Sequence, residues 1–120
     1  MAANPQAPAH TISTHVLDTE RGQPAAGIHV TLSRIGDDGK PIRMTQALTD
    51  ADGRVRDLLE RPLTAGDYRL EFRLGDKGPD AADDAFFQRL AVDLRVTDVT
   101  RSYHVPLLLS SFGMTTYRGS

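Results

Sequence analysis

The sequence predicts an all-β protein built as a sandwich of two sheets. Apolar and polar residues alternate with a period of two in a series of short segments, which is the pattern of half-buried strands. Turn signals made of Gly, Asp and Pro separate these segments about every 8 to 12 residues. A single short stretch is compatible with a helical turn. This combination is typical of a sandwich and not of an α/β protein, in which helices alternate with strands.

Five of the eight predicted strands lie before residue 75, at residues 11–18, 27–35, 42–49, 54–58 and 67–74. The strand at 67–74 is the clearest, because every second residue is apolar and the residues between are charged. In the strand at 27–35 the core side chains are expected to be Ile28, Val30 and Leu32, and the polar face to be His29, Thr31 and Ser33. The connections carry turn residues: a loop at 19–26, the pair Asp38-Gly39, and the sequence DADG at 50–53.

The C-terminal part begins with residues 75–87, which hold the predicted helical turn. Pro79 suits the first position of a helix, and the acidic residues that follow suit its N-terminal end. Strands are predicted at 90–96 and 103–109, and a last short strand leads into the ending Tyr-Arg-Gly-Ser. In the strand at 90–96 the expected core side chains are Leu90, Val92, Leu94 and Val96.

Composition limits the class of protein. The chain has 120 residues, of which 39% are hydrophobic and 25% charged, with a formal net charge of -2. This length predicts one domain, and the near-neutral charge gives no electrostatic reason to expect nucleic acid or a membrane as a partner. The absence of cysteine excludes disulfides and thiolate catalysis. Residues 1–10 lack the basic start and apolar run of a signal peptide, so we expect a flexible arm and a cytoplasmic protein.

The outward faces of two predicted strands are less polar than a solvated face should be. Alternation assigns the core face to Ile12, Thr14 and Val16 in one strand and to Tyr103, Val105, Leu107 and Leu109 in the other. The side chains left outside are Ser13, His15 and Leu17 in the first strand, and His104, Pro106 and Leu108 in the second. Isolated surface leucines are common. Because two strands show the pattern together, we favour a face that another subunit covers.

Three residues are candidates for chemistry. Histidine titrates near neutral pH, which makes His15 and His104 possible general bases; composition alone leaves open whether they are catalytic or simply packed in an interface. His10 in the arm and His29 on a polar face are expected to be solvated. Arg54 follows the Asp-Gly turn, where it is either a solvated arginine or a guanidinium that grips a planar anionic group through two hydrogen bonds.

Other kinds of catalytic site find little support. The sequence gives little support for a zinc site: the chain has no cysteine, no HExxH motif and no histidine pair at ligand spacing. It also lacks the GxSxG motif of a serine hydrolase and the P-loop of a nucleotide-binding protein.

Three stretches resemble the transthyretin-related 5-hydroxyisourate hydrolases. They are STHVLDTERGQPAAGIHVTL at 13–32, TDADGRV at 49–55 and YHVPLLLSSFGMTTYRGS at 103–120. The similarity spans residues 11–120. The final Tyr-Arg-Gly-Ser separates the hydrolases from the hormone-carrying transthyretins, which share the fold. Two positions depart from the usual pattern, with Ser111 in place of a proline and Met114 in place of an aromatic residue; they affect the rigidity and packing of a turn more than the reacting groups.

The resemblance implies a prealbumin-like sandwich of two four-stranded sheets with one short helix, formed by residues 11–120. It also implies a homotetramer whose active sites lie between dimers, with no metal and no organic cofactor. Position by position, the residues carried over as catalytic are His15, Arg54, His104 and Ser120. Those carried over as substrate-binding are His15, Arg54, Tyr117, Arg118 and Gly119.

Each of these residues has an expected role. His15 and His104 share the base and proton-shuttle work, and Arg54 stabilises the charge that develops on the substrate. Tyr117 forms a wall of the pocket, Arg118 pairs with nearby carboxylates, and Gly119 allows the backbone to come close. Ser120 is expected to offer its hydroxyl and the terminal carboxylate.

The implied reaction is the hydrolysis of 5-hydroxyisourate to 2-oxo-4-hydroxy-4-carboxy-5-ureidoimidazoline in urate degradation, by histidine-assisted attack of water on the cyclic amide. Two alternatives without catalysis stay open. One is a transthyretin-like carrier of a small ligand, and the other is an Ig-like binding module, whose TD-x-DG and G-x-Y stretches have counterparts at 49–53 and 66–68.

Overall fold

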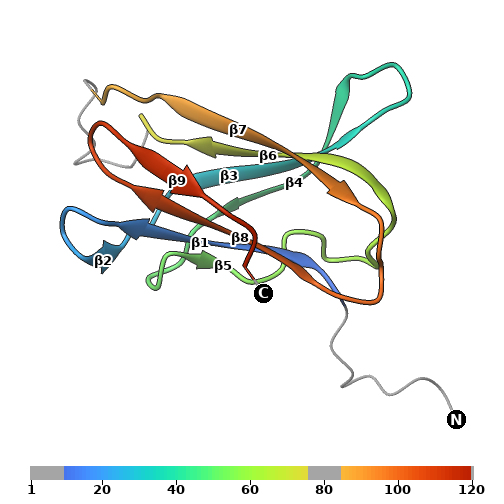
Figure 1. The fold of residues 1–120 in the computed structure, drawn as a ribbon, viewed down its shortest axis with the longest axis horizontal. Helices are drawn as coiled ribbons and strands as arrows, with labels where there is room; N and C mark the ends of the chain where they lie inside the picture. Colours follow the sequence, from blue (N-terminus) through green and yellow to red (C-terminus); the bar gives the residue numbers. More distant parts are fainter. Residues whose placement is uncertain (1–9, 76–84, 120) are drawn as a thin grey trace, which may run out of the picture.

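The computed structural model describes residues 10–75 and 85–119, which form two β-sheets packed face to face (Figure 1). Every regular element in these residues is a strand. The described residues therefore contain no helix that is long and apolar enough to cross a membrane. The predicted helical turn at 75–87 falls largely on residues 76–84, which lie outside the described residues. Most of the predicted arm at 1–10 and the predicted site residue Ser120 lie outside them as well.

The first sheet is built around a parallel pair, β1 (Ile12–Asp18) and β8 (Tyr103–Leu109). The free edge of β8 pairs with β9 (Met114–Thr116) in an antiparallel hairpin. The other edge of β1 pairs with two very short strands, β5 (Arg54–Val55) and β2 (Gln23–Pro24). We therefore refer to this layer as the β1–β8 sheet.

The second sheet is antiparallel throughout, in the order β4-β3-β6-β7. Its strands are β3 (His29–Ile35), β4 (Pro41–Leu48), β6 (Gly66–Arg73) and β7 (Arg89–Val96). A β-bulge interrupts the register of β3 with β4, because Leu32 pairs with Thr45 whereas Ser33 pairs with Arg43, which leaves Met44 as the extra residue.

All eight predicted strands are present, with small changes at their ends. The sandwich is confirmed, but the first sheet has a fifth strand, since β2 lies within the loop predicted at 19–26. It forms because Gln23 and Pro24 pair with Asp18 and Leu17. The strand predicted at 54–58 ends at Val55.

The core lies between the inner faces of the two sheets and follows the predicted alternation. Its largest fully buried side chains include Tyr68, Phe72, Ile12, Leu32 and Leu107. Leu90, Val92 and Leu94 are only half-buried, because β7 is the edge strand of its sheet. Ser33 was predicted on a polar face but is buried, since its short side chain stands in register between the long side chains of Arg43 and Arg69.

Candidate active site

The outer face of the β1–β8 sheet brings three of the predicted catalytic residues together. His15 on β1 stands directly opposite Arg54 on β5, and one step along the same face Ser13 stands beside His104 on β8. Residues paired directly across neighbouring strands share a face, with Cβ atoms about 5 Å apart. We call Ser13, His15, Arg54 and His104 the histidine cluster.

The DADG turn holds Arg54 against β1. The carboxylate of Asp50 accepts hydrogen bonds from the backbone N–H groups of Asp52 (2.8 Å) and Arg54 (2.9 Å). These bonds, with the Arg54 backbone first, hold the pKa of Asp50 below its usual range. Gly53 has φ of +77°, and a Cβ there would lie 2.4 Å from the carbonyl oxygen of Val16. Only glycine satisfies both conditions, so Gly53 allows the turn to pack against β1, where Arg54 pairs with His15.

A shallow cavity of about 150 Å³ opens on this face. Its lining residues are Ser13, Thr14, Arg54, Arg56 and His104. Arg56 is 3.9 Å from Asp52, whereas within residues 10–75 and 85–119 no carboxylate forms an ion pair with the Arg54 guanidinium. A guanidinium without a carboxylate partner is suited to hold a carbonyl or anionic group of a bound ligand.

His104 is held in a defined environment. Its Nδ1 lies 2.8 Å from the hydroxyl oxygen of Ser13, at hydrogen-bonding distance. Burial lowers the pKa of His104 below its ordinary value, and the positive charges of Arg54 and His15 lower it further. The imidazole is therefore neutral near pH 7, the state in which a ring nitrogen accepts a proton.

The C-terminal segment lies directly against this ring. Gly119 donates its N–H to the carbonyl oxygen of His104 at 2.7 Å. A Cβ on Gly119 would lie 2.8 Å from Cδ2 of His104 and 3.2 Å from its Cβ. The predicted close approach of the backbone at Gly119 is therefore present, and any side chain there would displace the ring or the segment.

The remaining predicted residues divide between two sides of the sheet. The pairs Leu107–Thr116 and His104–Gly119 follow one register, which sets Tyr117 opposite Pro106 on the outer face. Arg118 instead lies over the ring of Tyr103, with 4.9 Å from Cζ to the ring centroid. Within the described part of the chain no carboxylate pairs with Arg118, so its pairing with carboxylates stays a prediction, and the contact present is a cation–π contact with an aromatic ring.

The other histidines do not join the cluster. His10 is exposed, and His29 belongs to the second sheet, where it pairs with Leu48 and Arg73. The described residues hold no group of three side chains placed to bind a metal ion.

Sequence reasoning missed two members of this face, Ser13 and Arg56. Alternation placed Ser13 on the same face as His15, which was the available signal. Its proximity to His104 depends on the parallel pairing of β1 with β8, and the alternation pattern carries no information about that pairing.

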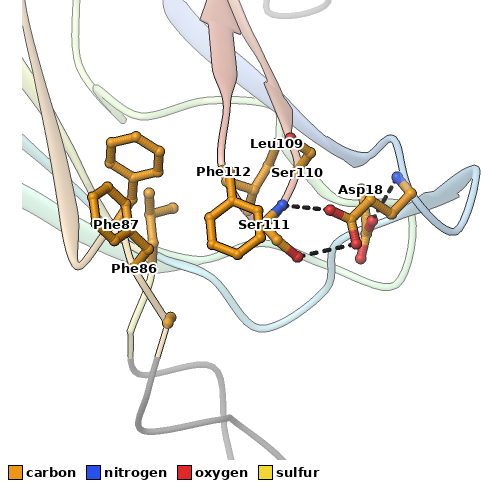
Figure 2. Close-up of a pocket in the computed structure, with 10 residues that line it drawn as sticks. Asp18, Phe86, Phe87, Leu109, Ser110, Ser111 and Phe112 are labelled. Atoms are coloured by element: carbon orange, nitrogen blue, oxygen red, sulfur yellow. Dashed lines mark hydrogen bonds between the residues drawn. The ribbon is translucent and has the colours of Figure 1, made fainter.

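A larger cavity, of about 260 Å³, lies at one end of the sandwich (Figure 2). Phe86, Phe87 and Phe112 line it together with acidic and hydroxyl side chains, and its described lining residues include no histidine, arginine or lysine. The carboxylate of Glu20 is already engaged by the backbone N–H (2.6 Å) and hydroxyl (3.0 Å) of Ser111. Asp18, the other acidic lining residue, accepts hydrogen bonds from the backbone N–H groups of Glu20 (3.0 Å) and Arg21 (3.2 Å), so both described carboxylates of this cavity are hydrogen-bonded within the chain.

The same two hydrogen bonds explain how the turn tolerates Ser111 where a proline is usual. Proline has no N–H to donate, whereas Ser111 donates both its N–H and its hydroxyl to Glu20. The turn is thus tied to the segment that follows β1 by hydrogen bonds in place of a rigid ring.

The family model described as "HIUase/Transthyretin family" matches residues 12–119. A 5-hydroxyisourate hydrolase of Deinococcus radiodurans is 44% identical over 115 residues, covering 91% of this chain and 95% of the relative. One of Caulobacter vibrioides is 41% identical over 114 residues, covering 91% and 97%.

Among solved structures, a 5-hydroxyisourate hydrolase of Klebsiella pneumoniae matches with a TM-score of 0.79 and 35% identity, covering 92% of this chain and 99% of that one. Sea bream transthyretin in complex with thyroxine matches with a TM-score of 0.81 and 28% identity, covering 90% and 93%. The two TM-scores are nearly equal, so the backbone fold alone does not separate a hydrolase from a carrier. The side chains of the site have to do so.

Proposed function

This chain belongs to the HIUase/Transthyretin family, and on that premise we propose that it hydrolyses 5-hydroxyisourate in urate degradation. The observation that carries the proposal is the histidine cluster: two histidines and an arginine without a carboxylate partner in the described chain share one face, and the C-terminal segment packs on one of the rings. The substrate is a planar small molecule with polar edges, which suits a shallow cavity lined by guanidinium groups.

The reaction opens a cyclic amide. The oxygen of a water molecule forms a bond to the ring carbonyl carbon, and the carbon–nitrogen bond of the lactam then breaks. A histidine takes the proton from water, and the leaving ring nitrogen receives a proton, so that the product 2-oxo-4-hydroxy-4-carboxy-5-ureidoimidazoline carries a new carboxylate. No oxidation state changes, and the chemistry asks for a base and for positive charge at the developing oxyanion.

The cluster supplies both requirements. His104 is neutral near pH 7, because burial and the neighbouring positive charges lower its pKa, and it is therefore available as the base. His15 stands opposite Arg54 and completes the proton shuttle, while Arg54 stabilises the oxyanion. Tyr117 forms a wall of the site on the same face.

The C-terminal segment closes the site in this proposal. Arg118 fixes it by stacking on Tyr103, and Gly119 lets it lie against His104. The proposal also keeps Ser120, the residue that follows Gly119 in the sequence, as a catalytic residue through its hydroxyl.

We further propose a homotetramer that covers this face, as well as a cytoplasmic location. Leu17 and Leu108 lie side by side on the outer face next to the cluster, where a second subunit would bury them and deepen the cavity. Sedimentation equilibrium measures the assembly, and fractionation of the source cells measures the location.

A carrier without catalysis is the second candidate, and the match to thyroxine-bound transthyretin is the observation that favours it. The two functions differ in whether they need residues 117–120. A carrier keeps its binding when the last four residues are removed, whereas the proposed hydrolase loses turnover.

The direct test generates 5-hydroxyisourate in situ with urate oxidase and follows the decay of its absorbance. We expect the purified protein to accelerate the decay far above the spontaneous rate. A decay unchanged by micromolar protein would overturn the hydrolase assignment and leave the carrier.

A further inference from the structure

We propose that Ser13 is a positioning residue for His104. Its hydroxyl oxygen accepts a hydrogen bond from Nδ1–H, so the free electron pair of the imidazole is kept on Nε2 at the open side of the site. This inference rests on the proposed function, in which His104 takes a proton from water.

The position of Ser13 follows from the parallel pairing of β1 with β8. Ser13 is the register partner of His104, and its Oγ lies 2.8 Å from Nδ1. Both side chains are half-buried and line the same cavity. Ser13 and His104 lie on paired parallel strands, so the hydrogen bonds between the strands hold the two residues side by side, and no loop is involved.

Two contacts hold opposite edges of the ring. Nδ1 and Cδ2 are the two atoms bonded to Cγ; the first meets Ser13, and the second faces Gly119, where even a Cβ would come within 2.8 Å. Rotation about the Cβ–Cγ bond is therefore restricted on both sides. In this proposal Nε2 is the ring nitrogen that faces a ligand in the cavity that His104 lines.

The role of the His104 ring as a base decides which of its two nitrogens carries the hydrogen. A neutral imidazole carries one N–H, and only the other nitrogen accepts a proton. A base that acts through Nε2 must carry its hydrogen on Nδ1, which makes Ser13 the acceptor. Within the described residues the Ser13 hydroxyl has no second partner, so nothing there competes for its electron pairs.

The charged groups around the ring fit this assignment. Arg54, Arg56 and His15 surround the pair on the same face, and no carboxylate in the described chain hydrogen-bonds to His104. A carboxylate is the usual partner that fixes the tautomer of a catalytic histidine. In this proposal the neutral hydroxyl accepts the Nδ1 hydrogen without adding a negative charge that would raise the pKa of the ring.

The first test compares Ser13→Ala with Ser13→Thr. Threonine keeps a hydroxyl group at position 13 and is a residue that strands favour. We expect kcat to fall about tenfold to a hundredfold in Ser13→Ala with KM little changed, by analogy with the loss of the hydrogen-bond partner that orients a metal-ligating histidine. Ser13→Thr should recover most of the rate. Ser33→Ala, a buried serine of the other sheet, is the matched control and should keep full activity.

The second test needs no substrate and so separates this inference from the proposed function. Nitrogen-15 NMR of the imidazole at a pH where His104 is neutral should show the hydrogen on Nδ1 in the wild type and a mixture of tautomers in Ser13→Ala. Hydrogen on Nε2 in the wild type, or identical tautomers in both proteins, would overturn the inference. If the tautomers behave as expected but the wild type does not hydrolyse 5-hydroxyisourate, the proposed function fails instead.

Discussion

The outer faces of the two sheets differ in whether their charged side chains form ion pairs. On the β4-β3-β6-β7 sheet, cross-strand ion pairs engage three of the arginines: Arg69 with Asp93 at 2.7 Å, Arg95 with Asp67 at 2.8 Å, and Arg89 with Glu71 at 3.4 Å. On the β1–β8 sheet, the histidine cluster has no ion pair to a carboxylate among the described residues, and the row beside it is apolar.

The contrast shows which face is built for solvent and which for a ligand. Exposed ion pairs such as Arg69–Asp93 contribute little to the free energy of folding, and their charged groups are typical of a surface in contact with water. Positive groups kept near each other without a carboxylate repel one another, which a fold tolerates where a ligand or a reaction uses the charge. The predictions below test this difference, from the largest expected effect to the smallest.

Removing a reacting group should have the largest effect. We expect His15→Ala, His104→Ala and Arg54→Ala each to lower kcat/KM at least ~100-fold, as for a positioned base or oxyanion partner, while circular dichroism shows a folded protein. Arg69→Ala on the opposite face is the matched control and should keep its rate. Equal losses on both faces would mean that the two faces do not differ in function.

Closing the gap at Gly119 should come next. In Gly119→Ala the new methyl group meets His104 at 2.8 Å, so the ring or the C-terminal segment must move, and we expect at least a tenfold loss of kcat, because small displacements of catalytic groups are costly. Gly113→Ala is the control, since a Cβ there has its nearest neighbour at 3.4 Å. Full activity of Gly119→Ala would show that the contact with His104 is not needed.

A charge at Leu108 should disrupt the proposed assembly. Leu108→Glu places a carboxylate on the apolar row beside the cluster, and we expect sedimentation to show smaller species together with a loss of activity at low protein concentration. Ala91→Glu, an exposed position on the other sheet, should sediment like the wild type. A tetramer that survives Leu108→Glu would locate the interface elsewhere.

The charge of Arg54 should also be visible in the titration of His104. Burial is the larger cause of the lowered pKa and stays in any variant, but Arg54→Gln removes the second cause, so the pKa of His104 should rise. Protonation then begins at a higher pH, and the acid limb of the rate profile moves upward. NMR titration of the ring measures the shift; Arg54→Lys keeps the charge and should titrate close to the wild type.

The smallest effect is expected on the ion-paired face. Asp93→Asn removes the partner of Arg69, whose hydrogen bond lowers the pKa of Asp93. Because the pair is exposed, we expect the denaturation midpoint and the hydrolytic rate to stay within experimental error at physiological salt. A large loss of stability would mean that this face does more than interact with water.

Much of this molecule was predictable from local patterns. Alternation identified the eight strands and the outward positions of His15 and His104, because successive side chains of a strand point to opposite faces whatever the strand pairs with. The DADG turn predicted the position of Arg54 after a glycine, since the positive φ of Gly53 is a local requirement. Family motifs then suggested what these residues do.

The tertiary structure decided which of these residues meet. Ser13 and His104 are 91 positions apart in the chain, and their contact exists because β1 pairs with β8 in one parallel register. The same holds for His15 with Arg54, and for Arg118, which stacks on Tyr103. Alternation is a property of each strand by itself, whereas register depends on how the two sheets bury their apolar faces together, so the sequence determined the faces and the fold determined the site.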